Sequence, residues 1–175
     1  MYFKIQISNP AIEDCSNQKR EDLSSAIFAA FPQATEDAIM VWNWVPIRIN
    51  YSCDLSVIIE NVLLMLSDLL QFDKGSRLTS FGANTFRAVW SLYWAGGNLT
   101  VDASWESIAG SYENLLNSRR TLKVPQAEFL IQWKALLKKV IEAIDYSGIK
   151  IQDKKQIGTL RGIEAAIPKA GGRTD

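Results

Sequence analysis

The chain contains no histidine. Histidine is the usual general base near neutral pH, the central group of Ser-His-Asp and Cys-His devices, and a frequent zinc ligand. A protein without histidine cannot use any of these arrangements. The absence therefore removes the most familiar catalytic and zinc-binding constellations from consideration.

Cysteines and glycine motifs are scarce as well. Cys15 and Cys53 are too few for a disulfide framework, and we interpret them as small apolar residues rather than as nucleophiles. The glycines never form a phosphate-binding loop or a dinucleotide fingerprint, and no G-K-[ST] motif occurs. We therefore predict no cofactor and no metal ion.

Long uninterrupted apolar runs are also missing. The opening segment, MYFKIQISNP, has neither the charged region nor the apolar region of a signal peptide. The most apolar stretch, residues 54–72, is interrupted by Glu60, Asn61 and Asp68 too often to span a membrane. We expect a cytoplasmic protein with reduced thiols and no membrane contact.

An excess of charge of one sign is absent too, since 19 basic residues balance 19 acidic ones. Six of the basic and three of the acidic residues lie from Lys150 onward, which leaves 13 and 16 in the body of the chain. The run Arg119, Arg120 and Lys123 could hold single-stranded nucleic acid beside aromatic side chains. A run of three charges is more often a solvated loop, and nucleic-acid binding needs an extended basic footprint, so we do not predict it.

The sequence does contain two long amphipathic segments. Residues 54–72 have no glycine or proline, and their polar residues gather on one arc of a helical wheel. Residues 125–144 begin at a proline and place their apolar side chains within a stripe of about 140°. Both segments predict helices that are covered over much of their circumference by other elements.

An aromatic hairpin is predicted between these helices. Residues 86–94 fit both a helical stripe and an alternating strand, whereas residues 99–105 alternate cleanly. Gly96 and Gly97 lie between the two runs, which is typical of a hairpin turn. A helix over the first run would leave the second without its nearest strand partner, so we choose the hairpin.

Shorter elements complete the prediction: strands at residues 2–8, 38–45 and 47–51, and helices at about residues 16–31 and 106–116. Pro46 breaks the second strand or places it at a sheet edge. The predicted class is α+β, with a small antiparallel sheet and its aromatic hairpin packed against the two long helices. Residues 1–148 form one globular domain, and residues 149–175 are expected to be a basic, flexible tail.

The first candidate site is acidic, and comprises Asp102, Glu106 and Glu113 on and just after the second hairpin strand. A pair of carboxylates could perform acid–base chemistry. Nothing in their spacing fixes two of them across a cleft, and solvated acidic side chains are far commoner. We therefore predict no catalytic residue and keep the three as candidates for contact with a partner.

The second candidate set is aromatic, because six tryptophans are many for a chain of this length. Core packing explains most of them, and Trp133 above all. Trp42 and Trp44 share one face of a predicted strand, and one face of an edge strand is less buried. Exposed tryptophan beside acidic groups is typical of protein-binding anchors, so Trp42, Trp44 and Trp94 join the candidate partner-binding residues.

The phrases INYSCDLSVIIENVLLML, SWESIAGSYENLLN and FLIQWKALLKKVIEAI, together with the hairpin, resemble a bacterial immunity protein of contact-dependent growth inhibition and other polymorphic toxin systems. The likeness spans residues 46–144 and carries no diagnostic short motif. It implies a small cytosolic antitoxin that binds one cognate toxin C-terminal domain and blocks its active site or substrate path. The implied partner is often a basic nuclease, which a mildly acidic body would suit.

Three hypotheses follow. The first is an immunity protein, which is not an enzyme and acts through the acidic and aromatic candidates. The second is a small enzyme that uses carboxylates or a divalent metal, in which case Asp102, Glu106 and Glu113 should converge in a pocket. The third is an adaptor subunit or a homodimer formed through an open sheet edge.

Overall fold

The computed structural model describes residues 1–169 and has the predicted α+β class, with three sheets and five α-helices in that range. The first sheet is antiparallel, in the order β1 (Phe3–Gln6), β3 (Ala38–Trp42) and β4 (Val45–Ile49). The second is antiparallel, in the order β5 (Lys74–Gly82), β6 (Phe86–Ala95), β7 (Asn98–Ile108) and β8 (Thr121–Pro125). The third is a short parallel pair of β2 (Lys19–Arg20) and β9 (Lys150–Ile151).

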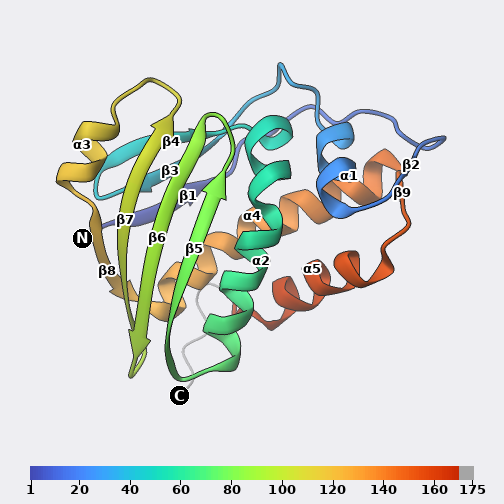
Figure 1. Ribbon diagram of the computed structural model, residues 1–175. Helices are drawn as coiled ribbons and strands as arrows, with labels where there is room; N and C mark the ends of the chain where they lie inside the picture. The colour runs from blue at the N-terminus through green and yellow to red at the C-terminus, as the bar shows by residue number, and fades with distance from the viewer. Residues whose placement is uncertain (170–175) are drawn as a thin grey trace.

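The helices lie mainly on one side of the four-stranded sheet (Figure 1). They are α1 (Leu23–Ala30), α2 (Ser56–Gln71), α3 (Glu113–Ser118), α4 (Gln126–Ser147) and α5 (Lys154–Ala166). In Figure 1, α4 runs behind the sheet, α2 lies beside β5, and α3 stands near the opposite edge. A π-helical turn at Tyr51–Leu55 leads into α2, and the Asn50 side chain caps that turn by accepting the Cys53 N–H.

The aromatic hairpin is confirmed as β6 and β7. Its turn, Gly96–Gly97, has backbone φ angles of 57° and 76°, which glycine adopts at little cost. Ala95 and Asn98 pair next to the turn, and Trp94 pairs with Leu99 one position farther along the strands. The hairpin belongs to a larger sheet than expected, because residues 74–82 form β5 and pair with β6 along their whole length.

The core between the two larger sheets is aromatic. Trp42 of β3 lies against Trp90 of β6 and Trp105 of β7, with ring centroids 5.0 and 5.4 Å apart. Trp90 and Trp105 are themselves 5.8 Å apart in an edge-to-face arrangement. Such contacts add to the hydrophobic gain of burying large rings, so this cluster joins the sheets.

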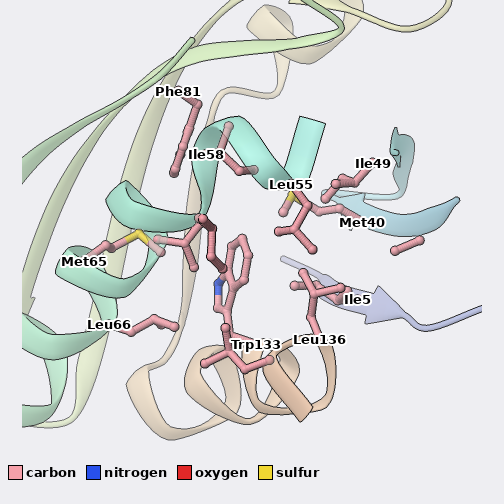
Figure 2. Close-up of a cluster of buried hydrophobic side chains, with 14 of the residues drawn as sticks. Ile5, Met40, Ile49, Leu55, Ile58, Met65, Leu66, Phe81, Trp133 and Leu136 are labelled. Carbon is pink, nitrogen blue, oxygen red and sulfur yellow. The ribbon is translucent and has the colours of Figure 1, made fainter. Parts of the chain in front are cut away.

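A second part of the core lies where the first sheet meets α2 and α4. Figure 2 shows Trp133 of α4 between Met65 and Leu66 of α2 and Ile5 and Met40 of the sheet. All five of these side chains are buried. The two long amphipathic helices therefore pack as their stripes predicted, with their apolar arcs turned toward each other and toward the first sheet.

Two predicted elements are wrong in extent. The helix expected over residues 106–116 does not begin until Glu113, because β7 continues to Ile108. The Asn117 side chain both accepts from the Trp105 N–H and donates to its carbonyl at 2.9 Å, which holds the end of the strand. The helix expected from about residue 16 begins at Leu23, where Asp22 accepts the Ser25 N–H at 2.8 Å.

Residues 149–175 were expected to be a flexible tail, but residues 150–151 and 154–166 form regular secondary structure. Residues 150–151 form β9, and α5 buries Leu160 and Ile163. Lys134 of α4 ion-pairs with Glu164 at 3.1 Å and donates to the Ile167 carbonyl at 2.7 Å, which holds the C-terminal end of α5. The rest of the predicted tail, residues 170–175, lies outside the described residues.

Candidate protein-binding surface at the turn between β3 and β4

The chain reverses direction between Trp42 and Val45, which pair with each other at the end of the β3–β4 hairpin. The two residues of the turn, Asn43 and Trp44, have φ angles of 47° and 71°. Asparagine tolerates this left-handed region, but tryptophan pays about 1–2 kcal/mol to enter it, since its Cβ crowds the following carbonyl. Glycine is the usual residue at the second turn position. Trp44 is therefore a strained residue at a site where a smaller one would fit better.

Asn43 fixes the turn to three other segments. Its N–H donates to the Tyr2 carbonyl at 2.8 Å, and its side-chain amide donates to the carbonyls of Arg119 and Thr121 at 2.9 and 2.8 Å. The Arg119 guanidinium in turn donates to the Asn43 carbonyl at 3.2 Å. Because Asn43 is buried and these bonds come from the N-terminal segment and the α3–β8 junction, the turn has little freedom to move.

Trp44 projects from this fixed turn into solvent. Its side chain is 69% exposed, the most exposed tryptophan of the chain. It stacks on Tyr2, with ring centroids 4.2 Å apart and planes 7° from parallel. The stack covers one face of the indole and restricts its rotation. Figure 1 shows this end of the molecule near the N-terminus and α3.

Two arginines lie against the turn that carries Trp44. Arg119 and Arg120 follow α3 and line an open pocket of about 490 Å³ with Asn43 and Thr121. Arg120 pairs with Asp102 at 3.0 Å, and Thr121 also donates to Asp102 at 3.0 Å. We define the Trp44 surface as Tyr2, Trp44, Arg119 and Arg120.

The structure removes two of the predicted partner-binding residues from any surface. Trp42 is fully buried between the sheets, and its indole N–H donates to the Arg119 carbonyl at 3.1 Å. Trp94 is 2% exposed, lies over Gly75 and donates to the Phe72 carbonyl at 2.8 Å. The prediction that Trp42 and Trp44 share a strand face is wrong because the strand ends between them.

The three acidic candidates do not form one site. Asp102 is neutralised by Arg120, and Glu113 accepts the Ile108 N–H at 2.8 Å near the end of β7. Glu106 is exposed on β7 and lies in none of the ion pairs found in residues 1–169. The pocket that the enzyme hypothesis requires is not assembled from these carboxylates.

Sequence reasoning missed or set aside three residues of this site. Tyr2 and Arg119 belong to the Trp44 surface, and Asn43 holds its turn in place. An asparagine between two apolar alternating runs was an available turn signal, because asparagine favours the first position of such turns. Arg119 was considered only as part of a basic run. No local signal placed Tyr2 against Trp44, because their stacking depends on the pairing of β1 with β3.

A second polar pocket, of about 450 Å³, lies at the π-helical turn beside Cys53. Its charged groups already have partners. Asp54 accepts the Asn50 N–H at 2.9 Å and the Thr85 hydroxyl at 2.6 Å, and Asp37 pairs with Arg48 at 2.6 Å. Within residues 1–169 no cluster of three or more His, Cys, Asp and Glu side chains is placed to hold a metal ion.

Burial raises the pKa of the Cys15 thiol and of the Tyr51 hydroxyl, because desolvation disfavours the charged form of each. Both groups are in the packed interior, so these pKa shifts describe the core rather than a reactive site. Among the helices of residues 1–169, none combines the length and apolarity that crossing a membrane requires.

No protein-family model, no curated protein and no solved structure matches the chain.

Proposed function

We propose that this chain is a protein-binding module that neutralises a cognate bacterial toxin domain, with the Trp44 surface as its contact. The proposal combines two independent supports. The resemblance to immunity proteins supplies the kind of partner, and the display of Trp44 supplies the place of contact.

The single observation that carries the binding role is that Trp44 places an exposed indole on a left-handed backbone, with φ at 71°. A tryptophan in the left-handed region costs about 1–2 kcal/mol, whereas its stack on Tyr2 returns about 0.5–1.5 kcal/mol. The indole is 69% exposed, so it gains little from burial in the free protein. Trp44 therefore adds little to the stability of the free protein. Strained, exposed residues held by a rigid frame are typical of functional sites.

The geometry suits the anchor of an interface. Tryptophan and arginine are the residues that most often dominate binding energy, and they do so when a partner encloses them. Asn43 and Tyr2 hold the indole before any partner arrives, which reduces the entropy lost on association. A toxin domain that received Trp44 in a pocket would have that pocket, or the path to it, occluded.

The proposal is tested by co-producing the chain with the C-terminal domain encoded by the gene immediately upstream, and measuring growth rescue and co-purification. We expect rescue by the wild-type chain and loss of rescue in Trp44→Ala. Tyr146→Ala is the matched control, since Tyr146 is 79% exposed and lies in the last turn of α4, at a different part of the fold. Equal rescue by wild type and Trp44→Ala would remove the Trp44 surface from the mechanism, and no rescue by wild type would reject the toxin domain as partner.

A further inference from the structure

The Trp44 surface has an electrostatic character that the composition of the chain does not suggest. The body of the chain is mildly acidic, yet the pocket at the turn that carries Trp44 is lined by Arg119 and Arg120, with Asn43 and Met1 beside them. Their positions and bonding partners specify what a complementary partner must present.

Arg119 is fixed to the β3–β4 turn by its own backbone and side chain. Its carbonyl accepts both the Trp42 indole N–H at 3.1 Å and the Asn43 amide at 2.9 Å. Its guanidinium donates to the Asn43 carbonyl at 3.2 Å, one residue before Trp44. The remaining guanidinium N–H groups, in a planar fork, are left for a ligand.

Arg119 has no acidic partner within the described part of the chain. The ion pairs of residues 1–169 use Arg120, Arg48, Arg77 and Arg161, but not Arg119. Arg120 is already compensated by Asp102 at 3.0 Å. The pocket therefore has one uncompensated guanidinium and one compensated guanidinium.

The polar side chains around Arg119 offer few free acceptors. Asn117 uses both of its side-chain groups on the backbone of Trp105. The side-chain oxygen of Asn43 accepts the Tyr2 N–H at 3.4 Å, and its amide nitrogen donates to two carbonyls. A ligand in this pocket consequently meets hydrogen-bond donors on a positively charged group, which favours an anion with two coplanar oxygens.

A carboxylate and a phosphate both meet that description, and the surroundings favour the carboxylate. A nucleic-acid strand needs a row of cations along its phosphates. Here Asp102 compensates Arg120, and Glu106 lies farther along the same strand, β7. One free arginine at the turn that carries Trp44 fits a single acidic side chain better than a polyanion.

We infer that the pocket at the turn that carries Trp44 binds an aspartate or glutamate side chain from an acidic segment of the partner protein, with the carboxylate held by two N–H groups of Arg119 that do not bond Asn43. This inference rests on the proposed function, because it names the chemistry of the partner that the Trp44 surface contacts. It reverses the expectation of a basic partner surface at this contact.

The inference is tested without the toxin, by titrating the ¹⁵N-labelled full chain with three probes. They are a short peptide of alternating aspartate and glutamate, its asparagine and glutamine counterpart, and a short single-stranded oligothymidine. We expect the acidic peptide to shift the Arg119 Nε–H and Trp44 Nε1–H resonances, with the shifts weakened by added salt. If the acidic peptide shifts neither resonance, the inference is overturned. A response to oligothymidine alone would overturn it in favour of a nucleic-acid backbone.

Variants separate the fork from its charge. Arg119→Gln should weaken binding of the acidic peptide roughly tenfold or more, since it removes the charge and the fork together. Arg119→Lys should recover only part of the affinity, and full recovery would contradict two-armed binding. Lys19→Gln on β2 is the charge-matched control, because it lies at the opposite end of the molecule (Figure 1). Near-ultraviolet circular dichroism of the Tyr2–Trp44 stack checks that each variant keeps the turn.

The two proposals fail in different ways. If the peptide results fail while growth rescue still depends on Trp44, only the acidic recognition is lost. If the acidic peptide binds at Arg119 but rescue does not depend on Trp44, the pocket chemistry holds and the neutralising role of this surface is lost.

Discussion

Trp42 and Trp44 are two residues apart, yet they belong to opposite kinds of environment. Trp42 is fully buried between the two larger sheets and contacts two further tryptophans, whereas Trp44 is 69% exposed and contacts Tyr2. In a continuous strand they would have shared one face. The tight turn at Asn43–Trp44 separates them by reversing the chain between Trp42 and Val45.

The comparison shows that a high tryptophan content has two separate causes in this protein. Trp42 stabilises the fold by burying a large apolar surface in the inter-sheet core. Trp44 occupies a strained backbone position and buries little, so its value has to lie outside the stability of the free chain. The predictions below test this division by substituting residues on each side of it.

The largest expected effect is on the core side. Trp42→Ala should lower the free energy of unfolding by about 3–5 kcal/mol, because it leaves a cavity between the sheets. Urea denaturation followed by far-ultraviolet circular dichroism measures this change. A loss below about 1 kcal/mol would show that the inter-sheet contact of Trp42 is not central to the fold.

Asn43 joins the two regions and should give the next largest effect. Asn43→Ala removes the amide that bonds the carbonyls of Arg119 and Thr121, and it also disfavours the left-handed backbone. We expect a loss of about 1–3 kcal/mol in unfolding free energy and a changed near-ultraviolet signal from Trp44. Asn43→Gly, which tolerates the left-handed backbone but lacks the amide, should recover only the backbone part of the loss.

Gly75 tests whether Trp94 belongs with Trp42, as its burial indicates. A Cβ at Gly75 would lie 2.5 Å from Cζ2 of Trp94, and Trp94 is held by its bond to the Phe72 carbonyl. Gly75→Ala should therefore destabilise the protein by about 1–3 kcal/mol in thermal or chemical denaturation. Gly82→Ala on the same strand is the control, because nothing lies within 4 Å of its added Cβ. Equal stability of the two variants would mean that Trp94 moves freely.

Tyr51 gives a smaller, pH-dependent effect inside the core. Burial raises the pKa of its hydroxyl above the model-peptide value of 10.0. The folded state therefore keeps this proton more tightly than the unfolded state, and the associated stability is present below pH 10 and lost as the pH rises through the folded-state pKa. Tyr51→Phe should flatten the fall in unfolding free energy above about pH 10. An unchanged alkaline slope in this variant would contradict the assignment.

The smallest change in stability is expected at Trp44 itself. Trp44→Gly relieves the left-handed strain but loses the stack on Tyr2 and adds flexibility to the unfolded chain. These terms nearly cancel, so the unfolding free energy should stay within about 1 kcal/mol of wild type. A loss above about 2 kcal/mol in chemical denaturation would place Trp44 among the structural residues and remove the basis for its binding role.

Periodicity predicted the parts of the fold in which local pattern and packing agree. The stripe of residues 125–144 and the Gly96–Gly97 turn led to α4 and the β6–β7 hairpin. It failed where tertiary partners decide the structure. Residues 74–82 contain Gly75, Arg77 and Gly82 and have little strand pattern of their own, yet the whole of β6 was available to pair with them.

The extents of β7 and of the helix after it were wrong for a similar reason. Asn117 and Glu113 bond the backbone of Trp105 and Ile108 from a later part of the chain. Those bonds extend the strand and shorten the helix, and no pattern within residues 106–116 announces them. Likewise, the C-terminal end of α5 is held by Lys134, which belongs to the preceding helix, α4.

The candidate site was predictable only in part. Sequence reasoning selected Trp44 as a candidate, but it did so through a strand face that does not exist. The arrangement that gives Trp44 its character requires Tyr2, Asn43 and Arg119 from three segments to meet at one turn. Composition gives only the number of each residue type and does not show which residues lie together in the fold. For the same reason, the mildly acidic charge of the body did not indicate a pocket lined by arginine.

The most direct test of the division between Trp42 and Trp44 is one paired measurement on Trp44→Ala. Its unfolding free energy and its affinity for the purified upstream-encoded toxin domain, by isothermal titration calorimetry, are compared with those of the wild-type chain. The account predicts a stability within about 1 kcal/mol of wild type and an affinity roughly thirtyfold weaker, the effect of losing one binding hot spot. Unchanged affinity together with a clear loss of stability would contradict it, because Trp44 would then serve the fold rather than the partner.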